Sequence, residues 1–288
     1  MKVASENITI RPMDEQDIAT AHAMTQALHW PHTRQDWQQI SSLGPSLVMK
    51  VDHQIIGTAC LVQQGNYASV GLIVIDDAFQ GQGLGRRIMN EIMSKAEPDT
   101  HFFLTATEMG KPLYQKLGFN EYTKIEQYQN HIDSRLIPAL SPKDSTVIRE
   151  LKSEESGIIQ TLMNGSTGMD RTAIAQKLAK QSTRILVTEN NGQVTGLAML
   201  RAFGRGYSIG PVIADHQENA LALIARHLTQ CDQQFVRLDI NNQYSRIGES
   251  LTQFGLNKVD TVSQMVKGTQ PKTQGPLTQY ALVTQALG

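Results

Sequence analysis

The chain has the same spacing of glycine and aspartate in both halves, and this internal repeat restricts its fold more than any other feature. Three positions of the first half coincide with the same residue type 139 positions later: Gly57 with Gly196, Gly71 with Gly210, and Asp76 with Asp215. Two β-rich stretches can align by chance, because apolar strands resemble one another. Three coincidences in one ungapped register favour a true duplication.

Hydrophobic periodicity predicts strands and helices in the same order in both halves. In the first half, strands are expected at 8–13, 46–51, 54–64, 68–76, 101–107 and from 119, and helices at 14–28, 33–40, 85–96 and 111–117. In the second half, residues 148–163 predict a strand and a helix, followed by a helix at 170–180, strands at 184–190, 192–202, 206–215 and 234–240, and helices at 219–230 and before Gly255.

The repeat and the punctuation of the chain predict where its parts begin and end. Residues 1–137 form the first domain and residues 145–268 the second, and the join lies in a segment where two prolines and polar residues interrupt the periodicity. Residues 269–288 form a tail in which a Pro-, Gly- and Gln-rich linker is expected to lead to a short helix.

Composition excludes several classes of protein. Hydrophobic residues make up 40% and charged residues 18% of the chain, so a substantial core is expected. With 26 basic and 27 acidic residues, the chain lacks the basic excess of a nucleic-acid-binding protein. No apolar run approaches the roughly 20 residues that span a bilayer, and the first residues lack the apolar stretch of a signal peptide.

The two cysteines, Cys60 and Cys231, indicate neither a disulfide framework nor a zinc site. These features predict a cytoplasmic protein with no metal and leave its oligomeric state open.

A glycine-rich turn between a buried strand and a helix is the segment most indicative of chemistry. Gln80 opens the run QGQGLG, and Arg86 follows it at the start of the predicted helix. Glycines let backbone N–H groups approach an anion closely, and a helix N-terminus presents unpaired donors at the positive end of its dipole. The segment therefore predicts a cradle for a pyrophosphate, to which Arg86 and Arg87 can add charge.

Two other nucleotide-binding motifs fit this turn poorly. The dinucleotide fingerprint G-x-G-x-x-G requires a different glycine spacing, and the strand at 101–107 carries no acidic residue for a ribose. A Walker A loop requires G-K-[ST], which is absent here. The turn instead matches Q/R-x-x-G-x-G/A, with Gln80, Gly83 and Gly85 at the defined positions.

This segment resembles the acetyl-CoA motif of the GNAT acetyltransferases. A second element follows at the family's distance, because Tyr114, Gly118 and Phe119 match Y-x-x-x-G-F. The resemblance covers most of residues 7–130, and the order of elements also resembles GNAT proteins with two such domains. It implies tandem α/β (α+β) folds, each a mixed, mostly antiparallel sheet flanked by helices and splayed between its fourth and fifth strands.

The resemblance also implies a site for acetyl-CoA as co-substrate. Pantetheine is expected along the fourth strand, at Ile73, Val74 and Ile75, through backbone groups. The residues expected around the pyrophosphate are Gln80, Gly81, Gln82, Gly83, Leu84, Gly85 and Arg86.

Amine acetylation requires a neutral amine, a polarised thioester and a proton for the leaving thiolate. By its match to the motif, Tyr114 is the candidate general acid; the alternative is that its ring only packs in the core. The general base is undefined, because Gly71 stands near the place where many GNAT enzymes have a glutamate. Glu108, after the fifth strand, is a candidate base or acceptor contact, or simply a solvated carboxylate, and a water relay is the default.

The segment between the first two helices is where GNAT proteins commonly build the acceptor wall. Trp30, His32 and Trp37 are candidates for lining it, with His32 binding or deprotonating the acceptor. The alternative is that both tryptophans are core residues and His32 is a surface group.

The second half resembles a degenerate copy. The run aligned with the glycine-rich turn is NALALI, and Leu251 stands at the position of Tyr114. Among its polar residues, Asp170 is expected to cap a helix. Arg171 and Asp239 are expected to be solvated or salt-bridged.

Two functions from different classes follow. The first is acetyl-CoA-dependent N-acetylation of a primary amine on a small molecule or protein, with neither nucleic acid nor membrane as partner. The alternative is a non-enzymatic acyl-CoA sensor or partner-docking protein, and a nucleotide-binding α/β protein is a weaker third option.

Overall fold

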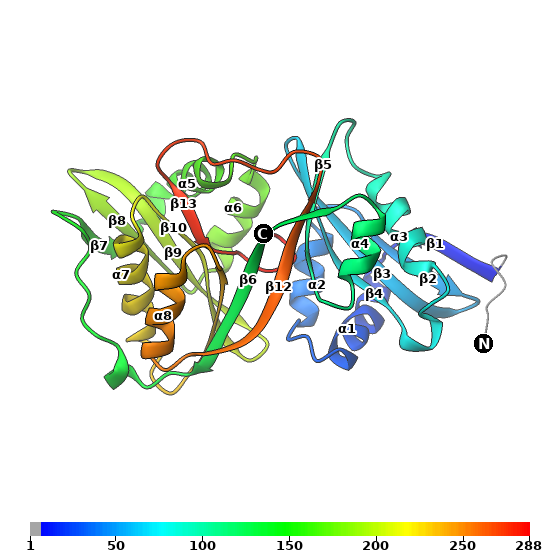
Figure 1. The fold of residues 1–288 in the computed structure, drawn as a ribbon, viewed down its shortest axis with the longest axis horizontal. Helices are drawn as coiled ribbons and strands as arrows, with labels where there is room; N and C mark the ends of the chain where they lie inside the picture. Colours follow the sequence, from blue (N-terminus) through cyan, green and yellow to red (C-terminus); the bar gives the residue numbers. More distant parts are fainter. Residues whose placement is uncertain (1–6) are drawn as a thin grey trace.

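The computed structural model describes residues 7–288 and contains one continuous sheet that both halves share (Figure 1). The first half contains β1 (Ile8–Pro12), α1 (Ile18–Ala27), α2 (Arg34–Ser41), β2 (Ser46–Val51), β3 (Gln54–Gln64), β4 (Tyr67–Ile75), α3 (Leu84–Met93), β5 (His101–Ala106), α4 (Lys111–Lys116) and β6 (Asn120–His131). The second contains β7 (Val147–Glu150), α5 (Gly157–Thr167), α6 (Thr172–Gln181), β8 (Arg184–Asn190), β9 (Gln193–Phe203), β10 (Gly206–Ala214), α7 (Gln217–Leu228), β11 (Phe235–Asn241), α8 (Ser245–Gln253), β12 (Asn257–Lys267) and β13 (Thr278–Ala281).

The last strands of the two halves are exchanged. The strand order is β1-β2-β3-β4-β5-β12-β6-β11-β13-β10-β9-β8-β7, so β12 of the second half pairs with β5 of the first. In turn, β6 of the first half lies between β12 and β11, antiparallel to both. Figure 1 shows β6 and β12 side by side at the centre of the molecule. The sequence did not predict this exchange. Because the strands are exchanged, the predicted boundary near residue 137 does not separate two independent sheets.

The predicted duplication is visible in the hydrogen bonding of the two halves. β9 and β10 lie 139 positions after β3 and β4 at both ends. The backbone N–H of Asp76 donates to Ile56 at 2.8 Å, and that of Asp215 donates to Thr195 at 3.1 Å, again at the same shift. The coincident aspartates therefore occupy equivalent strand ends.

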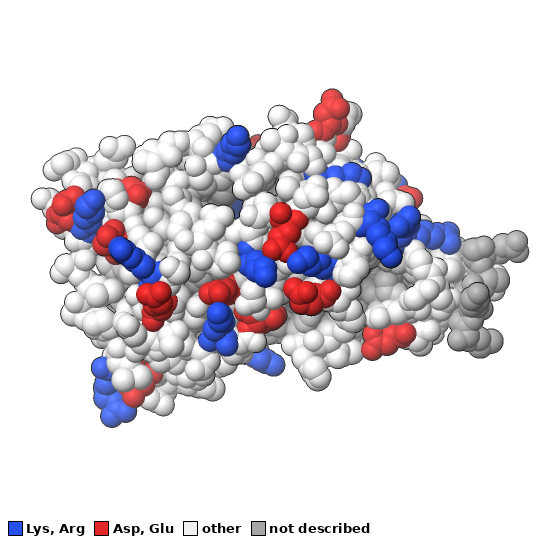
Figure 2. Space-filling view, in the orientation of Figure 1, with Lys and Arg blue, Asp and Glu red and all other residues white. Residues whose placement is uncertain are grey.

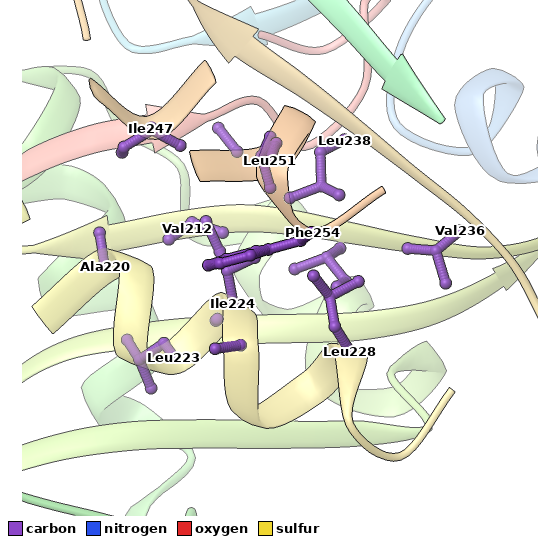
Figure 3. Close-up of a cluster of buried hydrophobic side chains, with 14 of the residues drawn as sticks. Val212, Ala220, Leu223, Ile224, Leu228, Val236, Leu238, Ile247, Leu251 and Phe254 are labelled. Carbon is purple, nitrogen blue, oxygen red and sulfur yellow. The ribbon is translucent and has the colours of Figure 1, made fainter. Parts of the chain in front are cut away.

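Apolar side chains form two outer cores and a central one. One outer core packs α3 and α4 of the first half against the sheet. The other packs α7 and α8 of the second half, with Phe254 and Leu251 among its buried residues (Figure 3). The central core joins residues of α1 and α2 to residues of α5 and α6 and includes Val283 and Leu287 of the tail. Because the halves share a core as well as strands, their stability is coupled.

The predicted terminal helix is wrong. Residues 278–281 form β13, and residues beyond it run as an irregular segment against the first half. An ideal Cβ on Gly71 would lie 3.0 Å from Cβ of Ala286, and one on Gly210 would lie 2.1 Å from the carbonyl oxygen of Leu282. The two glycines related by the repeat therefore both make room for the tail.

The predicted solvated or salt-bridged role of Arg171 is also wrong, because this side chain is fully buried. Its guanidinium donates to Oε1 of Gln64 on β3 and to the carbonyl oxygens of Leu287 and Gly288. A buried cation requires such hydrogen bonds to offset its desolvation. Arg171 therefore ties the second half, the first half and the tail together.

His227 makes stability depend on pH. It lies on α7 with no exposed surface, its Nε2 is 3.0 Å from the carbonyl oxygen of Ala198, and burial lowers its pKa to about 4. Between its usual value of about 6.5 and this value, the unfolded chain binds more protons than the folded one. Its contribution to stability is therefore complete above pH 6.5 and is lost as the pH falls towards 4.

We expect the free energy of unfolding to fall by on the order of 2–3 kcal/mol from this residue alone over that range. Urea unfolding at pH 7 and pH 5 measures it, and the loss should be smaller in His227→Gln than in the parent. His53→Gln, on an exposed turn, is the control. An identical pH dependence in the parent and His227→Gln would rule out this contribution.

No helix among residues 7–288 is long and apolar enough to cross a membrane. Within the same residues, no cluster of three or more His, Cys, Asp or Glu side chains has the geometry of a metal site. On the face shown in Figure 2, basic and acidic side chains are interspersed, without an extended field of one sign.

Candidate active site

The glycine-rich turn lines a groove of about 300 Å³ beside β4, α3 and α4. Of the residues predicted for the acetyl-CoA site, seven line this groove: Ile75, Gln80, Gly81, Gly83, Leu84, Gly85 and Arg86. Gln82 and Val74 do not line it, and Val74 is buried. Arg87 donates to the carbonyl oxygen of Ile8 and so is directed towards β1.

The backbone of the turn is open to an anion. Gly81 and Gly83 have φ of 73° and 78°, and an ideal Cβ at either position would meet no atom within 4 Å. Gly83 is the N-cap of α3 and offers no side-chain acceptor, so the first N–H groups of this helix remain available. Nε2 of Gln80 donates to the carbonyl oxygen of Ile75 at 3.0 Å, which holds the turn against the end of β4.

The sheet opens between β4 and β5 next to this turn. The two strands pair in parallel only from Tyr67 to Ser69, opposite His101 to Phe103. Leu72 has φ of 52°, and the β3–β4 register shifts between Thr58 and Cys60. Beyond Ser69, the edge of β4 that faces β5 is unpaired in this ladder, including Ile73 and Ile75. This matches the splay expected between the fourth and fifth strands.

A larger cavity, of about 400 Å³, lies between the two halves. Tyr114 of α4 and Ile73 of β4 line it, and Thr107 lines both this cavity and the groove. The two spaces therefore share a wall at Thr107, close to the start of α4.

Tyr114 is 7% exposed, and its ring packs edge-on against Phe119 with centroids 6.2 Å apart. Burial raises its pKa above its usual value near 10. No hydrogen bond among the described residues contributes to this shift, and burial is its only cause. Tyr114 therefore stays protonated through the physiological range and presents its O–H group at the cavity.

Two of the four candidate acceptor-wall residues line the cavity and two do not. Trp30 and His32 lie in its wall, with ring centroids 5.9 Å apart. Trp37 does not line it: this side chain is fully buried, and its Nε1 donates to Oγ1 of Thr25 at 3.2 Å. The reason is that α2 is amphipathic and Trp37 falls on its core face. Glu108 is exposed and lines neither space.

His32 is neutral at physiological pH, because burial lowers its pKa to about 4 despite the nearby carboxylate of Asp36. Its Nδ1 is buried without a hydrogen-bond partner in the structure. With a pKa this low, the imidazole binds a proton only weakly, so it can contact an acceptor but cannot hold its proton.

The sequence did not indicate which residues of β6, β9 and β11 line the far side of the cavity. Gln127 and Gln129 of β6, Arg237 and Asp239 of β11, and Arg201 of β9 all line it. Register explains this arrangement: Gln129 pairs with Arg237 and Gln127 with Asp239. These residues share one face of the sheet only because β6 is exchanged, and no local motif indicates this.

The corresponding opening of the second half is filled by the chain itself. β10 and β11 pair in parallel only at Tyr207–Val236 and Ser208–Arg237 and then diverge. β13 lies in the gap, antiparallel to both, with Ala281 opposite Val212 of β10 and Ile240 of β11. The tail thus occupies the place that corresponds to the splay between β4 and β5.

Comparison with known sequences agrees with this geometry. Two family profiles, both described as "Acetyltransferase (GNAT) domain", match residues 12–135 and 159–281. The chain therefore belongs to the GNAT acetyltransferases, and it is a tandem GNAT protein with one such domain in each half. Among curated relatives, the "Uncharacterized N-acetyltransferase YitH" of Bacillus subtilis (strain 168) is 29% identical over 240 residues, 83% of each chain.

Solved structures share the whole arrangement. A protein of Pyrococcus horikoshii assigned as an acetyltransferase has a TM-score of 0.82 at 18% identity and covers 99% of this chain and 98% of its own. A tandem GNAT protein from the clavulanic acid biosynthesis pathway has a TM-score of 0.64 at 11% identity, over 91% of this chain and 99% of its own. At these identities the likeness concerns the fold alone.

Proposed function

We propose that this chain is an acetyl-CoA-dependent N-acetyltransferase that acetylates a primary amine bound between its two halves. The observation that carries the proposal is the shared wall at Thr107, where a groove with an anion cradle meets the cavity that Tyr114 lines. A thioester held in the groove would present its carbonyl to an acceptor in the cavity.

The groove has the features that CoA binding requires. The pyrophosphate would lie against the N–H groups around Gly81 and Gly83 and the start of α3, with Arg86 at its edge. Pantetheine would lie along the unpaired edge of β4 at Ile73 to Ile75, which offers backbone donors and acceptors. Bound acetyl-CoA supplies the activated acyl group, and the chain supplies its position.

The proposed reaction is attack of the neutral amine nitrogen on the thioester carbonyl, with cleavage of the C–S bond. Tyr114 gives its proton to the departing sulfur, so that CoA leaves as the thiol, and solvent reprotonates the tyrosine. The proton lost by the amine passes to water, because Gly71 provides no carboxylate and His32 is too weak a base to hold it.

One acyl-CoA site per chain is proposed. β13 fills the corresponding opening of the second half, and the segment between β10 and α7, residues 215–216, contains no glycine. Leu251, at the position of Tyr114, is fully buried in the apolar core shown in Figure 3. The second half therefore contributes the far wall of the acceptor cavity instead of a second reaction centre.

Incubation with acetyl-CoA and a panel of primary amines, read by release of free thiol, tests the proposal. We expect amine-dependent thiol release and acetylated amine by mass spectrometry. Tight acetyl-CoA binding with no turnover on any amine would contradict it and support the acyl-CoA sensor instead.

A further inference from the structure

Three arginines of the second half line the acceptor cavity: Arg201, Arg205 and Arg237. They come from β9, from the turn between β9 and β10, and from β11, so all lie on the side of the cavity away from α4. Neither the anion cradle nor the proposed proton transfer uses them.

Arg201 is a buried cation without an anionic partner in contact. It is 9% exposed, and its Nε and Nη2 donate to the carbonyl oxygens of Gly210 and Val283. Nη1 has no hydrogen bond to any described residue. Asp36 and Asp239 act on it only at longer range, and burial outweighs them in lowering its pKa. Burying a charge in this way is costly unless a counter-ion joins it.

Arg237 adds a second unsatisfied donor. Its Nε and Nη2 form a fork to Asp239, at 3.1 and 2.9 Å, which leaves Nη1 unpaired among the described residues. It pairs with Ser208 of β10, which in turn pairs with Arg201 of β9, so the two arginines lie in one row across neighbouring strands. Arg205 is exposed at the rim.

Among the described residues, Asp239 balances the charge of Arg237, but no carboxylate facing the cavity hydrogen-bonds Nη1 of Arg201 or of Arg237. Asp239 is engaged by Arg237 and by Gln285, and Asp36 accepts hydrogen bonds from the N–H and Oγ1 of Thr33. Asp260 is exposed. The remaining basic group, Lys177, donates to Gln39 and Ser42.

The topology separates the arginines from the reaction centre. From β5, which carries Thr105 and leads to Thr107, the strands β12 and β6 intervene before β11. At about 4.8 Å per strand, the distance from β5 to β11 is roughly 14 Å. The side chain of Arg237 spans part of this distance. An acceptor touching both ends would measure on the order of 10 Å.

We propose that the acceptor is an amine whose other end carries an anionic group, carboxylate or phosphate, bound by Arg201 and Arg237. The second half would then select the acceptor, and the first half would activate the acyl donor. This inference rests on the proposed function, in that it places the amine end at Tyr114.

Matched acceptors test the charge requirement. A length series of ω-amino carboxylates is compared with ω-aminoalkyl phosphates, n-alkylamines and diamines by thiol release. We expect kcat/KM for an acceptor with an anionic group to exceed that for the n-alkylamine, which has none, by about tenfold to a hundredfold. This is the effect expected of charge-assisted hydrogen bonds. The carboxylate and phosphate arms identify the anion.

Arg237→Gln should remove most of this preference, and Arg237→Lys should retain part of it. The melting temperature should fall, because Asp239 loses its ion-pair partner. Unchanged acetyl-CoA affinity in both variants excludes misfolding as the cause. Arg205 is exposed at the rim, so Arg205→Gln measures how much an arginine that is not buried contributes to the preference. Arg246→Gln, on the exposed face of α8, is the control.

Calorimetric binding of the same compounds to the CoA-saturated protein decides the inference independently of turnover. Turnover of amines with no anion preference, a preference for diamines, or an anion preference that survives Arg237→Gln would overturn it while leaving N-acetylation intact. Thiol release from no amine would instead overturn the proposed function.

Discussion

Tyr114→Phe is expected to lower kcat by about two to three orders of magnitude, with little change in acetyl-CoA affinity. The hydroxyl is the only protonated group that the proposal assigns to the leaving sulfur, and burial keeps it protonated. Its loss should barely affect stability, because no hydrogen bond to another described residue contributes to its raised pKa. Steady-state kinetics with a turned-over amine, together with calorimetry for acetyl-CoA, separates the two effects.

Tyr67→Phe is the matched control, since Tyr67 lies at the start of β4 and lines neither the groove nor the cavity. It should keep parental activity. An unchanged kcat in Tyr114→Phe would remove the general-acid assignment, and a parallel loss of acetyl-CoA affinity would mean that Tyr114 acts in binding.

Expression of residues 1–143 alone is expected to give no cooperatively folded protein. In this fragment β6 loses both of its neighbours, β11 and β12, and β5 loses β12. The helices α1 and α2 lose the central core that they share with α5 and α6. Unpaired strand edges and exposed apolar faces favour aggregation over folding.

Circular dichroism and thermal melting measure this outcome. Co-expression of residues 1–143 with residues 144–288 is the control and should restore a soluble complex that binds acetyl-CoA, because every strand regains its neighbours. A fragment 1–143 that melts cooperatively and binds acetyl-CoA would show that the first half folds by itself.

Local features of the fold could be predicted from the sequence. The equal spacing of Gly57–Asp76 and Gly196–Asp215 identified two copies, and the alternation of strands and helices gave their order. Strand exchange could not be predicted, because β6 and β12 are both final antiparallel strands of equivalent copies. A polar–apolar pattern fixes which face of a strand is buried but not which copy it pairs with.

The candidate site likewise has one part that could be predicted from the sequence and one part that could not. The anion cradle of the groove is one contiguous turn, Gln80 to Arg86, and such a turn is recognisable because its backbone requirements are local. The cavity depends on Arg201 and Arg237, which come together with Tyr114 only through the exchanged strands. For Trp37 the sequence left open the acceptor wall and the core, and the structure buries it on the core face of α2, whereas Trp30 lies in the loop between α1 and α2.

The central claim is that each chain has one acyl-CoA site, in the groove formed by the turn at Gly83. Titration calorimetry of the protein with acetyl-CoA, for the parent and Gly83→Val, tests it most directly. At φ of 78° a β-branched residue is strained and its side chain enters the open space of the turn. The account predicts one site per chain in the parent and loss of binding in Gly83→Val. Two sites per chain, or full affinity in Gly83→Val, would contradict it.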